Sequence, residues 1–542
     1  MVRRLRIASQ TLFFLVFLFL LARTQYAGTD TLGLPVKVFL EIDPFHFLTT
    51  LLATGRVQGL LWLALITVAL TFVFGRAFCG WVCPMGTTIQ LVQKLPLRRR
   101  QSVIESNRWR PSQRIKFYLL GGLLVASVFG VQWSGVFDPL SLIIRSLGLI
   151  VLPGIELALR GLFDAAYRHN PLGLSGVTEP VFEWLKGRVV NFEQPHFQQT
   201  FLIGLVFLVI LVLSFSRHRF WCRVLCPLGA LLGGIARFGL LRIRQVDRCG
   251  GCGRCTFSCQ GAAEPEVPDG WRPSECVVCG NCTAVCPGSL KMGLRRPRVR
   301  PPKPAESPAP VPAPVFAGVG LRRRDFLLAS AGGLATVPLL RLGAVPGRFD
   351  PLLIRPPGAR AEREFLALCV RCGECMKVCL TNGLHPTLFE AGLEGIWTPR
   401  LVPRIGYCEY NCTLCGQVCP TQAIRRLPLE VKRKVKIGLA AIDTSRCLPY
   451  VFQTTCIVCE EHCPLPRKAI WFEGKDVPAH DGTPRRVKQP HIDPDLCTGC
   501  GICETKCVVQ DLPAVRVTSA NEDRNPDNRV LLERAPGGAY DR

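Results

Sequence analysis

The residues most able to do chemistry in this chain are its cysteines, 28 among 542 residues. Most of them fall into six sets of four, separated by long stretches without cysteine. Four sets have the spacing C-x2-C-x2-C-x3-C, and two have a longer first gap. Disulfides join well-separated partners of suitable geometry, whereas such close spacing favours metal binding. The six sets are Cys249, Cys252, Cys255 and Cys259; Cys276, Cys279, Cys282 and Cys286; Cys369, Cys372, Cys375 and Cys379; Cys408, Cys412, Cys415 and Cys419; Cys447, Cys456, Cys459 and Cys463; and Cys497, Cys500, Cys503 and Cys507.

Four soft thiolate ligands at this spacing are typical of a [4Fe–4S] cluster. Three cysteines of a run wrap one corner of the cube, and in two-cluster proteins the fourth cysteine of each run ligates the other cluster. We therefore expect the first two runs to exchange their fourth cysteines, Cys259 and Cys286. Structural zinc, the alternative, typically takes its ligands as two separated pairs, which does not describe these compact runs. The sequence predicts six [4Fe–4S] clusters, with all 24 cysteines as iron ligands.

The other four cysteines form two CxxxCP motifs. Cys79 and Cys83 lie at positions i and i+4, and Cys222 and Cys226 repeat this arrangement. Residues four apart share one face of a helix, so the four thiols could meet. They are candidates for a metal site or for redox-active thiols. Buried structural thiols are the alternative, because free cysteine packs as a small hydrophobe.

Long apolar runs surround these motifs, and the mean hydropathy of the chain is +0.25. Runs 9–23, 57–75, 117–133 and 200–216 approach the roughly 20 residues that a membrane-spanning helix needs. The basic segments 94–116 and 217–248 belong in the cytoplasm by the positive-inside rule, and the N-terminus then does too. Segment 140–163 is interrupted by charges, so we expect an amphipathic helix on the periplasmic surface, with a further span as the alternative.

The membrane part is predicted to be internally duplicated. An arginine precedes each CxxxCP motif, Arg76 in the first half and Arg219 in the second. Further upstream lie Asp43 and Asp138, each followed by proline. Each Asp-Pro pair is interpreted as the N-cap and first residue of a helix.

Beyond the membrane part the composition changes. Residues 297–314 contain eight prolines, which is typical of a semi-rigid spacer. The segment from Arg322, Arg323 and Arg324 onward resembles a twin-arginine export signal inside the chain, and the cationic flank of an ordinary anchor is the alternative. Both interpretations place the following residues in the periplasm. Residues 359–361 (Ala-Arg-Ala) are a candidate site for cleavage of the signal.

Several cofactors and partners are not expected. The net charge of +26 could indicate nucleic acid, but the Lys and Arg residues mostly flank apolar runs, so no nucleic-acid partner is predicted. The spans contain no histidine pair for a haem between helices, so no haem is predicted. No Gly-rich nucleotide-binding motif stands out either, so NAD is not predicted.

Residues 1 to about 290 resemble the NapH-type membrane ferredoxins of periplasmic nitrate reductase systems and their MauN-type relatives. The shared features are the four spans, the two CxxxCP motifs and the two cluster runs. Residues 322 to about 520 are similar to NapG/MauM-type proteins, on the twin arginines, the segment 354–359 (Ile-Arg-Pro-Pro-Gly-Ala) and four cluster runs. The chain departs from both types because it joins them, which suggests a natural fusion of two subunits.

Together these features predict an α-helical membrane domain of four spans, with a fifth, signal-anchor-like segment, followed by α+β ferredoxin-like [4Fe–4S] domains. The expected units are a membrane domain 1–240, a cytoplasmic two-cluster domain 241–294, a Pro-rich linker 295–321, the signal or anchor 322–345, a periplasmic four-cluster domain 346–520 and a polar tail 521–542, expected to be disordered.

The resemblance implies a bacterial inner-membrane protein that takes electrons from the quinone pool. Its N-terminus and first two clusters would be cytoplasmic, and its last four clusters periplasmic. By this resemblance quinol would be the substrate, and a periplasmic redox enzyme, such as a nitrate reductase, or a c-type cytochrome would receive the electrons. Among the last four runs, the resemblance implies pairing of the first with the fourth and of the second with the third; sequential pairing is the alternative.

A maturation or assembly factor is the alternative function. It would supply electrons or metal to a periplasmic enzyme, of the methylamine dehydrogenase or copper-handling type. The CxxxCP thiols would then be the working groups, since thiolates suit Cu(I). A purely structural membrane scaffold is a third hypothesis, and the ligand-spaced cysteines argue against it. The catalytic residues for quinol are not visible in the sequence.

Overall fold

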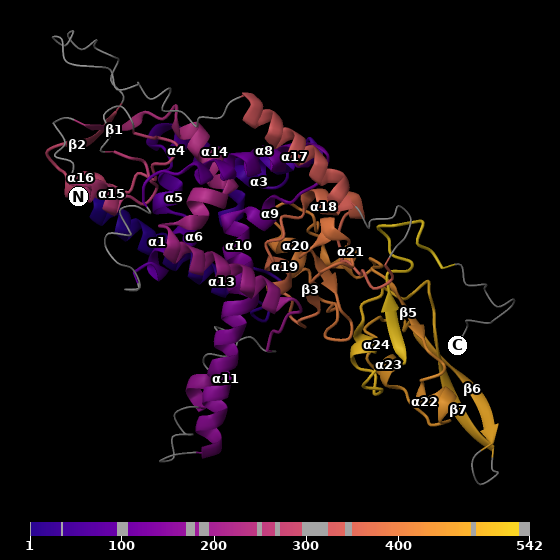
Figure 1. Ribbon diagram of the computed structural model, residues 1–542. Coiled ribbons are helices and arrows are strands. Elements are labelled where there is room, and N and C mark those ends of the chain that lie inside the picture. The colour runs from indigo at the N-terminus through magenta and orange to yellow at the C-terminus, as the bar shows by residue number, and fades with distance from the viewer. Residues whose placement is uncertain are drawn as a thin grey trace, which may run out of the picture.

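The computed structural model describes residues 2–33, 36–94, 107–169, 179–183, 194–245, 252–265, 271–294, 323–341, 350–478 and 484–530. Figure 1 shows three parts: a central helical part, a small domain at one end built around two strands, and a larger domain at another side with short helices and strands. The Pro-rich linker 295–321 lies outside the described residues.

The helical part consists mostly of short and medium helices. Their residues are largely apolar, as expected of a helix bundle in a membrane. The elements are α1 (Val2–Arg23), α2 (Val38–Glu41), α3 (Pro44–Thr54), the 3-10 turn η1 (Leu61–Leu63), α4 (Ala64–Phe74), α5 (Ala77–Trp81), α6 (Pro84–Val92), the 3-10 turn η2 (Pro111–Arg114), α8 (Ile115–Val128), α9 (Ser134–Phe137), α10 (Pro139–Ser146), the π-helical turn η3 (Leu147–Val151), α11 (Leu152–His169), α13 (Thr200–Ser216), the π-helical turn η5 (Trp221–Leu225) and α14 (Pro227–Ala236).

Two helices in the described residues are long and apolar enough to cross a membrane, Val2–Arg23 and Pro139–Arg168. The expected second, third and fourth spans form shorter helices instead, in α4, α8 and α13. Four spans are therefore not confirmed. Apolar side chains are nevertheless exposed along α1 and α13, for example Leu12 by 60% and Phe201 by 82%. Such a surface fits contact with lipid or another protein better than contact with water.

The segment 140–163 differs from the amphipathic surface helix that we expected. The elements α10, η3 and α11 follow one another without a break from Pro139 to His169. All of α10 is buried, whereas α11 projects away from the rest of the molecule (Figure 1). The charge of Arg145 does not exclude α10 from the interior, because its Nη1 donates to the carbonyl oxygens of Gly135 and Arg371.

The small domain contains one antiparallel pair of strands, β1 (Leu241–Gln245) and β2 (Leu290–Leu294), with Ile243 opposite Met292. Two short helices, α15 (Arg254–Ser258) and α16 (Asn281–Val285), complete it. Its buried core is made of a few aliphatic residues and cysteines. A core of this size supplies little hydrophobic stabilisation, so bound clusters would have to contribute to the stability of the domain.

The small domain docks onto α5 through the loop between Cys276 and Cys279. The side chain of Trp81 donates from Nε1 to the carbonyl oxygen of Val278 at 3.0 Å. Gly80 lies so close to this loop that a Cβ there would come 2.2 Å from the carbonyl oxygen of Val277. This contact requires glycine at position 80.

The larger domain is an α+β unit with three antiparallel strand pairs, β3 with β4, β5 with β8 and β6 with β7. Its elements are α18 (Glu362–Leu368), α19 (Glu374–Lys377), β3 (Leu384–Pro386), η6 (Leu393–Gly395), β4 (Pro399–Leu401), α20 (Leu414–Val418), α21 (Leu429–Lys432), β5 (Leu439–Ile442), α22 (Leu448–Val451), α23 (Val458–Glu461), β6 (Ile470–Pro478), β7 (Pro484–Ile492), α24 (Ile502–Thr505) and β8 (Val515–Thr518).

This larger domain docks onto the helical part in the same manner as the small one. The docking loop is the one between Cys369 and Cys372, and the carbonyl oxygen of Arg371 accepts a hydrogen bond from Arg145 at 2.8 Å. A Cβ on Gly135 would come 1.7 Å from the carbonyl oxygen of Val370. Equivalent loops of the two cluster domains therefore face the helical part.

The helix α17 (Arg323–Arg341) lies along α8 (Figure 1). Gly333 and Ala329 on α17 pack directly against Gly122 and Gly121 on α8. Small residues four apart that let two helices approach closely are typical of helix packing in membranes. The first arginine of the twin-arginine-like segment, Arg322, lies outside the described residues.

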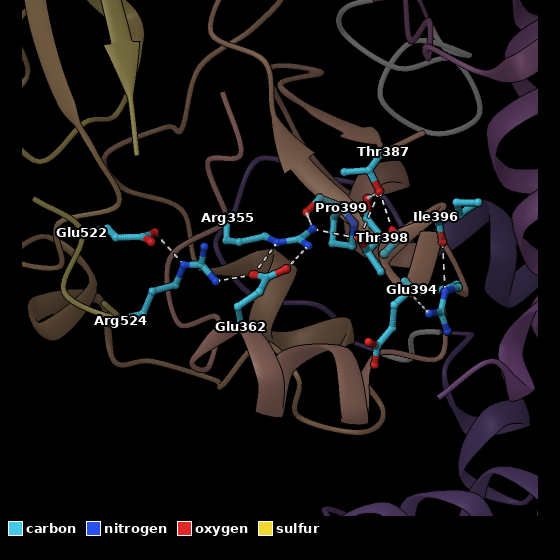
Figure 2. A network of polar contacts seen from close by, with 11 residues as sticks. Arg355, Glu362, Thr387, Glu394, Ile396, Thr398, Pro399, Glu522 and Arg524 are labelled. Atoms are coloured by element: carbon cyan, nitrogen blue, oxygen red, sulfur yellow. Dashed lines mark hydrogen bonds and ion pairs between the residues drawn. The ribbon is translucent and has the colours of Figure 1, made fainter. Parts of the chain in front are cut away.

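One expectation for the ends of the larger domain, the disordered tail, is corrected by its packing. Residues 521–530 of the expected disordered tail fold back onto the domain: Arg524 bridges Glu362 and Glu522 (Figure 2), and Asn528 donates to the carbonyl oxygen of Ser519. The residues from 531 onward lie outside the described range. The candidate cleavage site is also packed, because Ala359 is buried and bridges to Ile424.

Candidate iron–sulfur sites and thiol cluster

Four small cavities in the structure are each lined by four cysteines. In every case three cysteines come from one run and the fourth is the last cysteine of a neighbouring run. We name them site N (Cys276, Cys279, Cys282 and Cys259), site A (Cys369, Cys372, Cys375 and Cys419), site B (Cys408, Cys412, Cys415 and Cys379) and site D (Cys497, Cys500, Cys503 and Cys463).

The remaining two sites are described in part. Cys447 lies within electrostatic range of Cys456 and of Cys507, which places the last cysteine of the sixth run beside the fifth run. Together with Cys459 these residues form site C. The sixth set would be Cys249, Cys252, Cys255 and Cys286, and its first member lies outside the described residues.

Consecutive runs exchange their fourth cysteines in the larger domain. The pairing of first with fourth and second with third, which the resemblance implied, is therefore wrong for this structure, and the sequential alternative holds. The physical reason is that α19 packs against α20 and α23 against α24, so the first of the four runs meets the second and the third meets the fourth.

The local sequence explains how a run curls around its site. In the C-x-x-C loops of sites N, A and D, the second intervening residue has a positive φ: 51° at Val278, 53° at Arg371 and 71° at Gly499. A glycine follows the second cysteine of these runs and also has a positive φ, for example 67° at Gly280. Glycine reaches this left-handed conformation without strain, and a short helix carrying the third cysteine starts directly after it.

Burial favours the protonated form of several free thiols at these sites. Burial, followed by neighbouring thiolates, raises the pKa of Cys447 to about 11 and that of Cys459 to about 12. Burial likewise raises the pKa of Cys500 to about 12. Iron binds the thiolate, so assembly of a cluster must displace these protons. Four converging soft donors in an apolar cavity fit a [4Fe–4S] cluster.

The sites of the larger domain form a connected series. The thiols of Cys375 in site A and Cys415 in site B lie within electrostatic range of each other. The backbone amide of Cys408 in site B donates to the carbonyl oxygen of Cys500 in site D at 2.8 Å. Cys503 of site D in turn lies within range of Cys459 of site C. The order is therefore A, B, D and C, with A against the helical part.

The CxxxCP thiols come together as expected, between the two halves of the helical part. Cys79, Cys83, Cys222 and Cys226 are all buried and lie within electrostatic range of one another. Arg219 donates to the carbonyl oxygen of Cys79 at 2.8 Å, so the arginine of one half binds the motif of the other. This thiol cluster lies in the same apolar core as Cys279 of site N.

The thiol cluster is not a compact site for a single ion. Within the described residues, only one group of three or more His, Cys, Asp or Glu side chains has its ligand atoms all within 4.8 Å of one another, and it contains none of these thiols. That group is Asp43, His46 and Asp138. Sequence reasoning identified the two aspartates only as helix N-caps and missed His46, whose position in the first turn after Asp43 was the available signal.

Comparison with known proteins supports the iron–sulfur assignment. A family model described as a 4Fe-4S binding domain matches residues 49–103 and again residues 199–245, the two halves that carry the CxxxCP motifs. A second 4Fe-4S binding domain model matches residues 490–507, around the last cysteine run. No solved structure matches the chain significantly.

Two kinds of curated relatives cover different portions of the chain. The methylamine utilization ferredoxin-type protein MauM of Methylorubrum extorquens is 37% identical over 39% of this chain and 96% of its own length. The ferredoxin-type protein NapG of Escherichia coli is 36% identical over 36% of this chain and 84% of its own. MauN of Methylorubrum extorquens is 29% identical over 46% of this chain and 67% of its own. The chain therefore belongs to the NapG/MauM-type ferredoxin family, in which it represents a fusion with a polyferredoxin of the NapH/MauN kind.

Proposed function

We propose that this protein is a membrane-bound electron carrier that accepts electrons from quinol and passes them through six [4Fe–4S] sites to a periplasmic oxidoreductase or c-type cytochrome. Iron–sulfur electron transfer follows from the family. The names of the MauM and MauN relatives connect those proteins with methylamine utilization, and the resemblance to nitrate reductase subunits suggests a second kind of acceptor.

The observation that carries the proposal is the position of site A. The loop Cys369–Cys372 is pressed against α9 and α10 of the helical part, and sites B, D and C lead away from it. Figure 1 shows the larger domain extending from the helical part to the β6–β7 hairpin. An arrangement of this kind suits a carrier that is loaded at the membrane and unloaded at its far end.

Within this proposal the chain's own residues hold and insulate the path. Each run supplies three thiolates from one loop and its partner run the fourth, and when bound, a [4Fe–4S] cluster supplies reversible one-electron chemistry. Apolar residues such as Leu414 and Val418 pack around the runs and exclude water. Hydrogen bonds to the sulfur atoms, such as that from the amide of Ile424 to Cys419 at 3.5 Å, tune the potential.

The proposed location is the bacterial inner membrane, with site N cytoplasmic and sites A to D periplasmic. The exposed apolar surface of α1 and α13 and the close packing of α17 on α8 support a membrane bundle that includes the shorter apolar helices. In this topology α17 is the retained anchor that carries the chain across. A reporter fused after residue 294 should then face the cytoplasm and one after residue 520 the periplasm; the same side for both would refute it.

Quinol-driven reduction tests the function. Anaerobic membranes containing this chain should show, by electron paramagnetic resonance, reduced cluster signals after addition of a quinol, with dithionite giving the total of reducible clusters. Signals that appear with dithionite but not with quinol would contradict the proposal. They would favour the alternative of a maturation factor, for which the structure offers no compact thiol site within the described residues.

A further inference from the structure

The N-termini of α3 and α10 meet inside the helical part, one from each half of the duplication. Asp43 Oδ1 accepts the amide of Phe45 at 2.8 Å, and Asp138 Oδ2 accepts the amides of Leu140 and Ser141, each at 2.8 Å. Capping accounts for one oxygen of each carboxylate. The other two, Asp43 Oδ2 and Asp138 Oδ1, are buried and have no hydrogen-bond partner among the described residues.

His46 reaches this pair of carboxylates from the first turn of α3. Its Nε2 lies 3.2 Å from Asp138 Oδ2, 3.9 Å from Asp43 Oδ2 and 2.8 Å from Ser141 Oγ. One donor atom from each of the three residues lies within 4.8 Å of the others. Asp43, His46 and Asp138 are all completely withdrawn from solvent.

The charges of this cluster balance only if a cation binds or one carboxylate carries a proton. Two buried carboxylates face one imidazole, which can offset at most one of them. Arg145 lies within electrostatic range of Asp138, but its Nη1 donates to backbone carbonyl oxygens of Gly135 and Arg371 instead. Buried charges are normally paired or bound to a metal, and a buried polar atom without a partner indicates a missing one.

We propose that Asp43, His46 and Asp138 form a binding site for one divalent metal ion. A divalent cation would neutralise both carboxylates and bind one donor atom from each of the three residues, whereas a proton shared by Asp43 and Asp138 would neutralise only one carboxylate and leave His46 as a hydrogen-bond partner of Asp138 and Ser141. Carboxylate and imidazole donors suit Mn²⁺, Fe²⁺ or Zn²⁺ and do not select Cu(I). The ion would tie the two halves together beneath the surface on which the larger domain docks.

The test compares the metal content of the unmodified full-length protein with that of matched variants. All proteins are produced in Mn²⁺-supplemented medium, purified anaerobically and washed with a chelator. The double variant Asp43→Asn/Asp138→Asn keeps both caps, because Asn caps a helix as well as Asp does, but lacks the two anionic ligands. We expect about one non-cluster metal ion per chain in the unmodified protein and at least tenfold less in the double variant, with the dithionite-reduced cluster signal unchanged. Mössbauer spectroscopy counts a mononuclear Fe²⁺ apart from the clusters.

Two further variants keep the test decisive. Asp30→Asn is the matched control, because Asp30 accepts hydrogen bonds from Thr413 in the other domain, and it should retain the metal. The variant His46→Gln leaves both helix caps unchanged and should also contain at least tenfold less non-cluster metal per chain. This variant tests the proposal even if the double variant fails to fold. Two results would overturn the proposal in favour of a proton shared by the carboxylates. One is an unmodified protein that contains no metal ion outside the clusters, and the other is a His46→Gln variant with as much of this metal as the unmodified protein.

Discussion

Glu362 shows how one ionisable residue joins distant segments of the larger domain. Its carboxylate pairs with the buried Arg355 and with Arg524, which comes from the end of the described chain (Figure 2). Burial alone would raise the pKa of Glu362, but Arg355 and Arg524 more than offset this and lower it to about 2. The folded state therefore keeps this carboxylate ionised at pH values at which the unfolded chain would protonate it.

This pairing predicts an acid-dependent contribution to stability. Because the folded pKa is lower than the unfolded one, the contribution is complete above about pH 4.5 and is lost as the pH falls towards 2. Glu362→Gln should destabilise the domain by about 2 kcal/mol at pH 7, since it leaves the buried Arg355 without its anionic partner. Thermal unfolding of the full chain should show this difference at pH 7 and a much smaller one near pH 3; an equal difference at both would contradict the assignment.

At the same scale, the sequence identified the cysteines but not all of the chemistry around them. The C-x-x-C-G-x-C pattern of four runs specified the loops, because glycine is needed where φ is positive, as at Gly373 with 84°. By contrast, nothing in the sequence placed His46 opposite Asp138, because they are 92 positions apart and meet only through packing of the two halves.

At the scale of elements, the two docking contacts are made by glycines on short helices. Gly135 on α9 meets the carbonyl oxygen of Val370, and Gly80 on α5 meets that of Val277. Both carbonyls belong to C-x-x-C loops, so each contact brings a candidate cluster site against the helical part. The contacts therefore determine how close the sites come to the helical part.

Gly135→Ala should loosen the docking of the larger domain. The added Cβ would lie 1.7 Å from a carbonyl oxygen, a separation at which the backbone must shift. We expect at least a tenfold slower quinol-driven reduction of site A, with the dithionite-reducible signal unchanged. Gly154→Ala on α11 is the control, because a Cβ there meets nothing within 4 Å, and it should reduce normally. Equal rates in both variants would exclude this contact from electron entry.

The elements also show where sequence patterns are insufficient. The amphipathic surface helix expected in segment 140–163 rested on Arg145, Pro153, Glu156 and Arg160, but backbone carbonyl oxygens satisfy Arg145 inside the protein. The disordered tail was expected from its polarity, but Arg524 and Asn528 find specific partners. The order in which cluster runs pair depends on which helices pack together, which residue spacing does not encode.

At the scale of the whole molecule, two kinds of cluster domain flank one helical part. Site N adjoins the thiol cluster of the CxxxCP motifs, and site A adjoins Arg145 and α10. Because both cluster domains belong to one chain, each is held at a high effective concentration near the helical part. Separate subunits would reach the same proximity only by binding to one another with high affinity. This arrangement supports a single path outward through sites A, B, D and C.

The measurement that tests this path most directly interrupts it in the middle. The variant Cys412→Ala/Cys415→Ala removes two ligands of site B, and Cys456→Ala/Cys459→Ala removes two of the terminal site C. After addition of quinol to anaerobic membranes, electron paramagnetic resonance should detect reduced site A in both variants, but reduced site D only in the second. Reduction of site D at the normal rate without site B would contradict a path that runs outward from the membrane.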